Sequence, residues 1–216
     1  AQPRDRLPVQ ERLLDDRPEH VIPWGKRRPP VEATDPNNRW GFAMQLPEHS
    51  MNLGELYNLS IRRGTLTAEE RFKINDHIVQ TLIMLRSLPF PKHLQAVPDI
   101  AANHHERLDG RGYPRGLSAE HLGVPDRVLA IADIFEALTA ADRPYKTPKP
   151  LSEAVNILCQ MAMDQHVDAS LLILVLESGL HREYGRRFLR PEQLDDVDVV
   201  ACIARLKGIV RPAGPV

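Results

Sequence analysis

Residues 104–117 read HHERLDGRGYPRGL, and this stretch decides how the rest of the chain is interpreted. Two adjacent histidines are followed by Glu106 and Asp109, and then by two glycines and a Tyr-Pro pair. Imidazole and carboxylate groups are ligands that first-row divalent metals take in proteins. Glycine allows a tight backbone turn and proline stiffens it. The stretch therefore indicates a metal-binding loop, provided that other segments supply further ligands.

The segments around this loop predict an all-α fold. Thr67 and Glu70 form a capping box that begins a helix running to about Leu88. Its apolar stripe has a 3.6-residue period and consists of Ile74, Ile78, Leu82 and Leu85. Further helices are expected over residues 98–108, 126–141, 151–163 and 168–179, with a shorter one from Pro191, and residues 197–210 fit a helix or a strand. In the helix over 126–141 the side chains expected to face inward are Val128, Ile131, Ala132, Phe135 and Leu138.

Composition divides the chain into three parts. Residues 1–52 are proline-rich and predict an irregular segment, with at most one short helix near residues 8–16. Residues 53–180 form the helical domain, and residues 181–216 form a C-terminal helical extension in which a homodimer contact is an open alternative. Asp168 is a good N-cap and Gly179 a good residue to follow a helix.

Charge and cysteine content exclude several classes of protein. The net charge is −1, so no global charge favours a nucleic acid polymer or a membrane surface. No apolar run is long enough to span a bilayer in this segment. Two cysteines predict reduced thiols and a cytoplasmic location, while membrane association of a longer parent protein stays open.

Two further residues could join the loop in one site. His77 lies in the middle of the first long helix beside Asp76, and Asp133 stands at the margin of the apolar stripe of the helix over 126–141. A carboxylate in that position needs a partner, because burying a lone charge is costly. Several helices of a bundle can converge such side chains on one point. A lone histidine is more often packed or solvated, and that is the interpretation for His20, His49, His93, His121, His166 and His181.

Taken together, these segments resemble a known family. The HD-GYP family carries the pattern H-H-E-x-x-D-G-x-G-Y-P, which is met at His104, His105, Glu106, Asp109, Gly110, Gly112, Tyr113 and Pro114. With RVLAIADIFEALTAADRPYK at residues 127–146, the resemblance extends from about Leu53 to Gly179. HD-GYP proteins are a branch of the HD superfamily of metal-dependent phosphohydrolases.

The resemblance implies a fold, a metal centre and a substrate. The fold is a helical bundle with a bi- or trinuclear iron or manganese centre, and the usual substrate is cyclic di-GMP, hydrolysed to the linear dinucleotide or to GMP. Four residues match metal ligands of the family: His77, His104, His105 and Asp133. Arg143 and Lys146 match residues that contact the substrate phosphate, and the loop from Glu106 to Pro114 matches a segment linked to binding of GGDEF-type cyclases.

One part of the family pattern has no counterpart. The family is named for a His-Asp dyad whose aspartate bridges the metals, and none of the nine histidines here is followed by aspartate. The nearest candidate in position is His49-Ser50. We expect the chain to be the C-terminal part of a longer protein, with the dyad before residue 1. A degenerate member that lost catalysis is the alternative, but it would be expected to lose the remaining ligands as well.

Three functions follow from these observations. The first is a cyclic di-GMP phosphodiesterase whose isolated fragment is weak or inactive, because the bridging ligand is missing. The second is a non-catalytic signalling module that binds cyclic di-GMP or a GGDEF-type partner through the loop around Tyr113. The third, an HD-superfamily phosphohydrolase or oxygenase acting on another substrate, is disfavoured by the Gly-Tyr-Pro motif.

Overall fold

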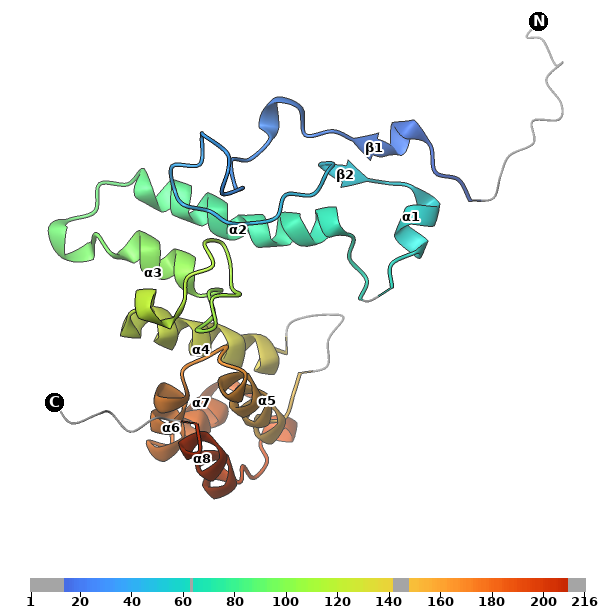
Figure 1. Cartoon of the computed structure of the whole chain (residues 1–216). Helices are drawn as coiled ribbons and strands as arrows, with labels where there is room; N and C mark the ends of the chain where they lie inside the picture. Colours follow the sequence, from blue (N-terminus) through green and yellow to red (C-terminus); the bar gives the residue numbers. More distant parts are fainter. Residues whose placement is uncertain (1–13, 63, 142–147, 210–216) are drawn as a thin grey trace, which may run out of the picture.

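The computed structural model describes residues 14–62, 64–141 and 148–209, and within them the regular secondary structure is almost entirely helical (Figure 1). The all-α prediction is confirmed. The α-helices are α1 (Glu55–Leu59), α2 (Ala68–Arg86), α3 (Val97–Asn103), α4 (Val124–Thr139), α5 (Leu151–Met163), α6 (Ala169–Glu177), α7 (Leu180–Phe188) and α8 (Val199–Lys207). Short 3-10 helices are η1 (Pro18–His20), η2 (Gly25–Arg27), η3 (Lys92–Leu94), η4 (Ala119–His121) and η5 (Pro191–Gln193). Strands β1 (Val21–Ile22) and β2 (Met51–Asn52) form one small antiparallel pair.

Local sequence signals set several helix ends. Thr67 Oγ1 accepts a hydrogen bond from the backbone N–H of Glu70 at 3.2 Å, and the Glu70 carboxylate accepts from Thr67 N–H at 2.9 Å, as the capping box predicts. Asp168 caps α6 by accepting from the N–H groups of Ser170 and Leu171. Gly179 has a left-handed φ of 75° just past the end of α6. Helix α5 has the predicted bounds, and the segment that fitted a helix or a strand forms the helix α8.

The helix predicted over residues 98–108 is shorter than expected and ends at Asn103. The prediction was wrong for the last turn because the following residues form a compact loop. The buried carboxylate of Glu106 accepts the backbone N–H groups of Arg115 at 2.7 Å and Leu117 at 2.9 Å. These loop contacts replace the hydrogen bonds that a continued helix would make.

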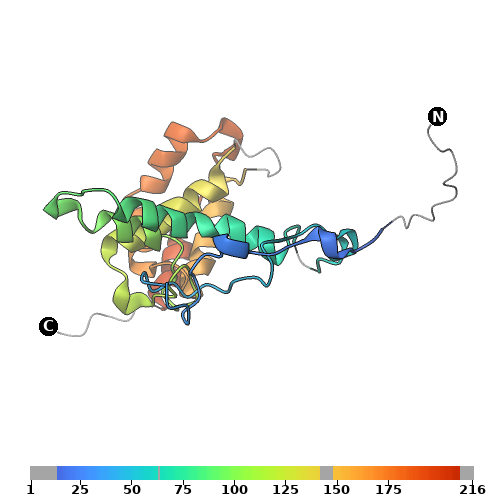
Figure 2. The same ribbon diagram turned by 90° about the horizontal axis from the view of Figure 1, so that it is seen from above.

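The proline-rich N-terminal segment packs along α2 (Figures 1 and 2). Val31 and Phe42 are fully buried, and with Met44 they share one core with α2 and α3. The Trp24 ring meets Phe72 of α2 edge-on, with centroids 5.5 Å apart. The segment therefore closes the apolar face of α2 even though it holds little regular structure. Most of the short helix expected near residues 8–16 lies outside the described residues.

A second core lies between α4, α5, α6 and α8. Val155 and Leu158 of α5 meet Leu172 of α6 and Leu206 of α8, all nearly without exposed surface. Cys159 and Cys202 are buried in this core and unbridged. Burial, and then the neighbouring Cys202, raise the pKa of the Cys159 thiol to about 12. Both cysteines thus act as core residues, and the Cys159 thiol stays protonated at neutral pH.

Some predicted inward positions face outward. Ile74 is 54% exposed, because α2 turns Phe72, Ile78 and Val79 toward its neighbours instead. Val128 is 49% exposed and Ala132 is also exposed. Both line the mouth of a cavity between α4 and α7 rather than a closed core. In the described part of the chain, no helix has both the length and the hydrophobicity needed to cross a membrane.

Candidate metal centre

Three histidines from separate segments meet at one point. His77 comes from α2, His104 follows the last residue of α3, and His105 begins the loop. One ligand nitrogen of each lies within 4.8 Å of those of the other two. The ring centroids of His104 and His105 are 4.2 Å apart, and those of His77 and His105 are 5.2 Å apart. Because α2 packs against α3, residues 27 positions apart in the chain, His77 and His104, are brought together.

Backbone carbonyls fix how two of these rings present their nitrogens. Nδ1 of His104 lies 2.7 Å from the carbonyl oxygen of Ala101, and Nδ1 of His77 makes the equivalent contact with Ile74. A carbonyl oxygen can only accept, so each Nδ1 carries a proton, and Nε2 is the nitrogen through which each neutral ring would bind a metal. Orientation of a ligating imidazole by such a second hydrogen bond is typical of metal sites. The donor set therefore fits a divalent transition metal.

His105 is held in the neutral form that a metal ligand needs. Burial, and then the nearby His104, lower the pKa of His105 to about 4, while the charge of Asp133 opposes the shift. The ring stacks on Tyr113 at a centroid distance of 4.8 Å and an interplanar angle of 25°. The backbone N–H of Tyr113 also donates to the His105 carbonyl at 3.2 Å. His105 is thus fixed from both its backbone and its ring face.

Asp133 lies beside this cluster on the half-buried side of α4. Its charge reaches both His105 and Tyr113. Burial, and then Asp133, raise the pKa of the Tyr113 hydroxyl to about 12. Among the described residues, the group whose ligand atoms are mutually within 4.8 Å contains the three histidines and not Asp133. A shift of its side chain would be needed for Asp133 to join them.

The loop after the histidines folds tightly around Glu106, which is only 2% exposed. Burial raises the pKa of Glu106, and the N–H donors of Arg115 and Leu117 oppose that shift. At Gly112, an added Cβ would lie 2.4 Å from the backbone of both Glu106 and Arg107, so only glycine allows the chain to cross there. Gly110 takes a left-handed φ of 75°. Glu106 and both glycines therefore determine the shape of the loop.

The outer part of the loop is held by Asp109 and Pro114. Asp109 forms an ion pair with Arg107 at 2.7 Å and accepts the N–H of Arg111 at 3.0 Å. Burial alone would raise the pKa of Asp109, but these two partners hold it below its usual value. The Tyr113–Pro114 peptide is cis, and the Pro114 carbonyl accepts the N–H of Ala43 at 2.8 Å. The N-terminal segment is thus bonded directly to the loop.

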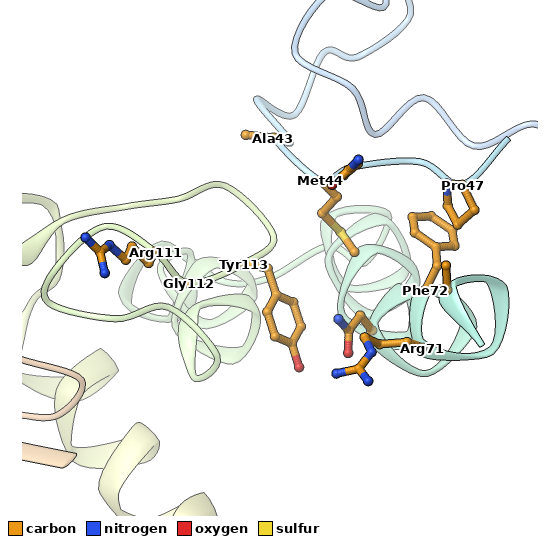
Figure 3. Close-up of a pocket in the computed structure, with 11 residues that line it drawn as sticks. Ala43, Met44, Pro47, Arg71, Phe72, Arg111, Gly112 and Tyr113 are labelled. Atoms are coloured by element: carbon orange, nitrogen blue, oxygen red, sulfur yellow. The ribbon is translucent and has the colours of Figure 1, made fainter. Parts of the chain in front are cut away.

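A cavity of about 440 Å³ opens between the loop, α2 and the N-terminal segment (Figure 3). Tyr113 separates it from His105, and Phe72 and Met44 give it apolar walls. Arg71 and Arg111 are both among its lining residues, although the Arg111 side chain points away from Tyr113 and Arg71 (Figure 3). A volume in the range of about 300–1,000 Å³ is typical of sites for small molecules.

Comparison with known proteins identifies the family. The sequence pattern of the HD domain matches residues 8–171, which is most of the chain. The chain belongs to the HD domain family. Within that family, the relatives and the motif at residues 104–114 make it a member of the HD-GYP type.

Relatives of this HD-GYP chain are named as cyclic-dinucleotide phosphodiesterases. It is 44% identical over 79 residues to the 3′3′-cGAMP-specific phosphodiesterase 1 of Vibrio cholerae, covering 37% of this chain and 18% of the relative. It is 42% identical over 94 residues to a cyclic di-GMP phosphodiesterase of Thermotoga maritima, covering 44% and 25%. For a cyclic di-GMP phosphodiesterase of Pseudomonas aeruginosa the identity is 41% over 113 residues, covering 44% and 27%. The chain thus spans about a quarter or less of the length of these relatives.

Not every site residue predicted for this HD-GYP chain can be placed. Arg143 and Lys146 lie outside the described residues. Arg115 was not among the predicted site residues, yet its guanidinium donates hydrogen bonds to Asp99 at 3.2 Å and to Asn103 at 2.6 Å. Asn103 in turn donates to Asp126 of α4 at 2.9 Å. This partly buried network ties the end of α3 to the loop and to α4. The Pro125-Asp126 pair at the start of α4 is the one feature of the sequence that points to this network. Asp126 caps the helix by accepting a hydrogen bond from Gly123 N–H.

Proposed function

We propose that this chain is the greater part of the catalytic domain of a metal-dependent phosphodiesterase that hydrolyses cyclic di-GMP. The observation that carries the proposal is the cluster of His77, His104 and His105 beside the Gly-Tyr-Pro loop, in which Nε2 is the nitrogen through which the neutral rings of His77 and His104 would bind a metal. The names of the relatives support the substrate class, since they include cyclic di-GMP and 3′3′-cGAMP phosphodiesterases. A guanine-containing cyclic dinucleotide is therefore the substrate to test first.

The proposed ligands are the three histidines together with Asp133, and iron or manganese is the proposed metal. A bound divalent cation supplies a Lewis acid for the phosphoryl oxygens and activates a nucleophile at neutral pH. The residues of the chain orient the ligands: Ile74 and Ala101 through their carbonyls, and Tyr113 by stacking on His105. Arg143 and Lys146 are proposed to bind the phosphodiester, because cations offset its charge.

We further propose that the chain on its own turns over cyclic di-GMP slowly or not at all. None of its nine histidines precedes an aspartate, so the bridging ligand of the family has no counterpart. Three histidines and one aspartate suffice for one metal but lack a group that would bridge two. The missing dyad is expected in the part of the parent protein that precedes residue 1.

Metal content tests the site directly. The chain is purified anaerobically and its metals are counted by elemental mass spectrometry, beside His104→Ala and a control His121→Ala. His121 is exposed and its side chain contacts Ser118 and Glu120 rather than the cluster, so the two substitutions are matched in kind. We expect about one iron or manganese per chain in the unaltered protein and in His121→Ala, and a loss in His104→Ala. A metal-free unaltered chain would contradict the proposed site.

Turnover and partner binding separate the alternatives. If the isolated chain hydrolyses cyclic di-GMP at rates typical of enzymes, the proposed inactivity is wrong. If the full-length parent binds the dinucleotide without hydrolysing it, the chain is a signalling module. A role of the loop in binding a GGDEF-type protein predicts that Tyr113→Ala loses the partner while metal content is kept. Light scattering tests the proposed homodimer, and a clean monomer would remove it.

A further inference from the structure

The cavity of about 440 Å³ between the loop, α2 and the N-terminal segment, here called the loop cavity, holds polar groups that the metal centre does not use (Figure 3). Phe72 and Met44 form its apolar walls. Arg71 and Asn75 of α2 and Gln45 of the N-terminal segment add one guanidinium and two amides. Among the described residues that line the cavity, none is acidic. The lining therefore suits a ligand with apolar faces and with hydrogen-bond acceptors along its edge.

Arg71 supplies the loop cavity with unpaired donors. Its side chain is exposed at the end of the first turn of α2 and extends toward Tyr113 (Figure 3). Within the described part of the chain, the Arg71 guanidinium forms no ion pair and donates no hydrogen bond, whereas Arg86 of the same helix pairs with Asp99. A guanidinium holds its N–H donors in one plane, so it can donate two parallel hydrogen bonds to a ligand that has two adjacent acceptors.

Tyr113 connects the loop cavity with the metal centre. Its ring stacks on His105 at a centroid distance of 4.8 Å, and the same side chain lines the cavity. Because stacked rings lie about 4.5–7 Å apart, an aromatic ligand beside Tyr113 would lie about 10 Å from the His105 ring. One sugar and its phosphate span a gap of that length. A nucleotide could therefore keep its base in the cavity and its phosphate at the histidines.

We propose that the loop cavity is the subsite for one guanine base of the cyclic dinucleotide, and that Arg71 donates two hydrogen bonds to O6 and N7 of that base. Guanine presents these two acceptors side by side, and an arginine fork is the group that most often recognises them. Adenine carries an amino group in place of O6, so it would oppose the Arg71 donors with a donor of its own.

The proposal rests on the proposed phosphodiesterase function and names the residue that selects the base. An aromatic wall at Tyr113 allows either purine to stack, so the choice between them falls to Arg71. Cyclic di-GMP and 3′3′-cGAMP, the compounds in the names of the relatives, both contain guanine. A guanine subsite would therefore serve either compound.

Three mononucleotides with the same sugar and phosphate test the subsite on the whole chain. Guanosine and inosine monophosphates both keep O6 and N7, whereas adenosine monophosphate has an amino group in place of O6. Protein-observed NMR should show that the first two bind about tenfold more tightly than the third, which is the discrimination expected of one bidentate contact. Arg71→Lys keeps the charge but loses the planar fork, so the three affinities should then agree within about twofold. The matched control Arg182→Lys alters an exposed arginine of α7 and should leave the preference unchanged.

Metal content measured on the same samples separates this proposal from the proposed function. Arg71→Lys should keep its metal, because Arg71 is not a proposed ligand. Equal binding of the three nucleotides by the unaltered chain, or no binding of any, would overturn the guanine subsite even where metal is present. A preference that survives Arg71→Lys would equally overturn it. A metal-free chain that still prefers guanosine and inosine monophosphates would contradict the metal site and support the subsite.

Discussion

Replacing Gly112 by alanine would add one methyl group at the point where the loop crosses its own backbone. The new Cβ would lie 2.4 Å from Arg107 N and from Glu106 Cα, and 2.6 Å from the carbonyl carbon of Glu106. Carbon atoms in contact are ordinarily about 3.5–4.0 Å apart. All three neighbours are backbone atoms, so no side chain can rotate away. The loop must retreat by about 1 Å to reach an ordinary contact.

That retreat removes contacts that hold the loop to the metal centre. It lengthens the hydrogen bond from Tyr113 N–H to the His105 carbonyl, which is 3.2 Å in the unaltered chain. It also strains the two backbone hydrogen bonds that the Glu106 carboxylate accepts. Overpacking costs about 1–3 kcal/mol, and a hydrogen bond to a charged group contributes about 1.5–3 kcal/mol. We expect Gly112→Ala to lower the free energy of unfolding by about 3 kcal/mol. In a chain of this size that lowers the Tm by about 6–12 °C.

The assay is thermal unfolding followed by circular dichroism, with metal content measured on the same samples. Gly41→Ala is the matched control, because Gly41 has a positive φ of 73° but nothing within 4 Å of an added Cβ. Its free energy of unfolding should fall by only about 1 kcal/mol, the cost of placing alanine in a left-handed conformation, and it should keep its metal. Equal melting temperatures for the two variants would refute the reasoning, since the steric contact would then carry no cost.

Three further predictions rest on single contacts. Asp168→Ala removes the N-cap of α6 and the 2.7 Å ion pair with Arg127. Urea unfolding should show that the free energy of unfolding falls by about 2 kcal/mol. Trp24→Ala should lower the free energy of unfolding by about 2–3 kcal/mol in the same assay, because it removes the ring that packs against Phe72. The folded pKa of His105, about 4, lies below its ordinary value of 6.5. Metal-free protein should therefore lose stability as the pH falls from 6.5 toward 4, and His105→Gln should lose less over that range.

Where local signals suffice, the sequence predicts this fold well. The capping box at Thr67 and the N-cap at Asp168 depend on contacts within three residues, and both form as expected. The motif at residues 104–114 predicts the family, which the comparisons confirm. The roles of His77 and Asp133 in binding metal stay predictions.

Contacts between distant segments account for what the sequence could not predict. Ile74 fits the helical period as well as Ile78 does, but the N-terminal segment and α3 cover only the face that includes Ile78. The early end of α3 depends on Arg115 and Leu117, which bond Glu106 from farther along the chain. The network of Arg115 joins residues 16 and 12 positions apart, beyond the reach of a periodic pattern.

The packing of the N-terminal segment on α2 has a consequence for folding during synthesis. Phe42 leaves the ribosome before any of α2, so the core that it shares with Val79 and Leu82 cannot close until α2 has been made. Contacts of this sequence separation form slowly, and exposed apolar chains invite association while they wait. A chain cut at Leu53 would have the opposite defect, because α2 would form with its core face open to water. Residues 14–52 therefore serve to cover the apolar face of α2, however little regular structure they contain.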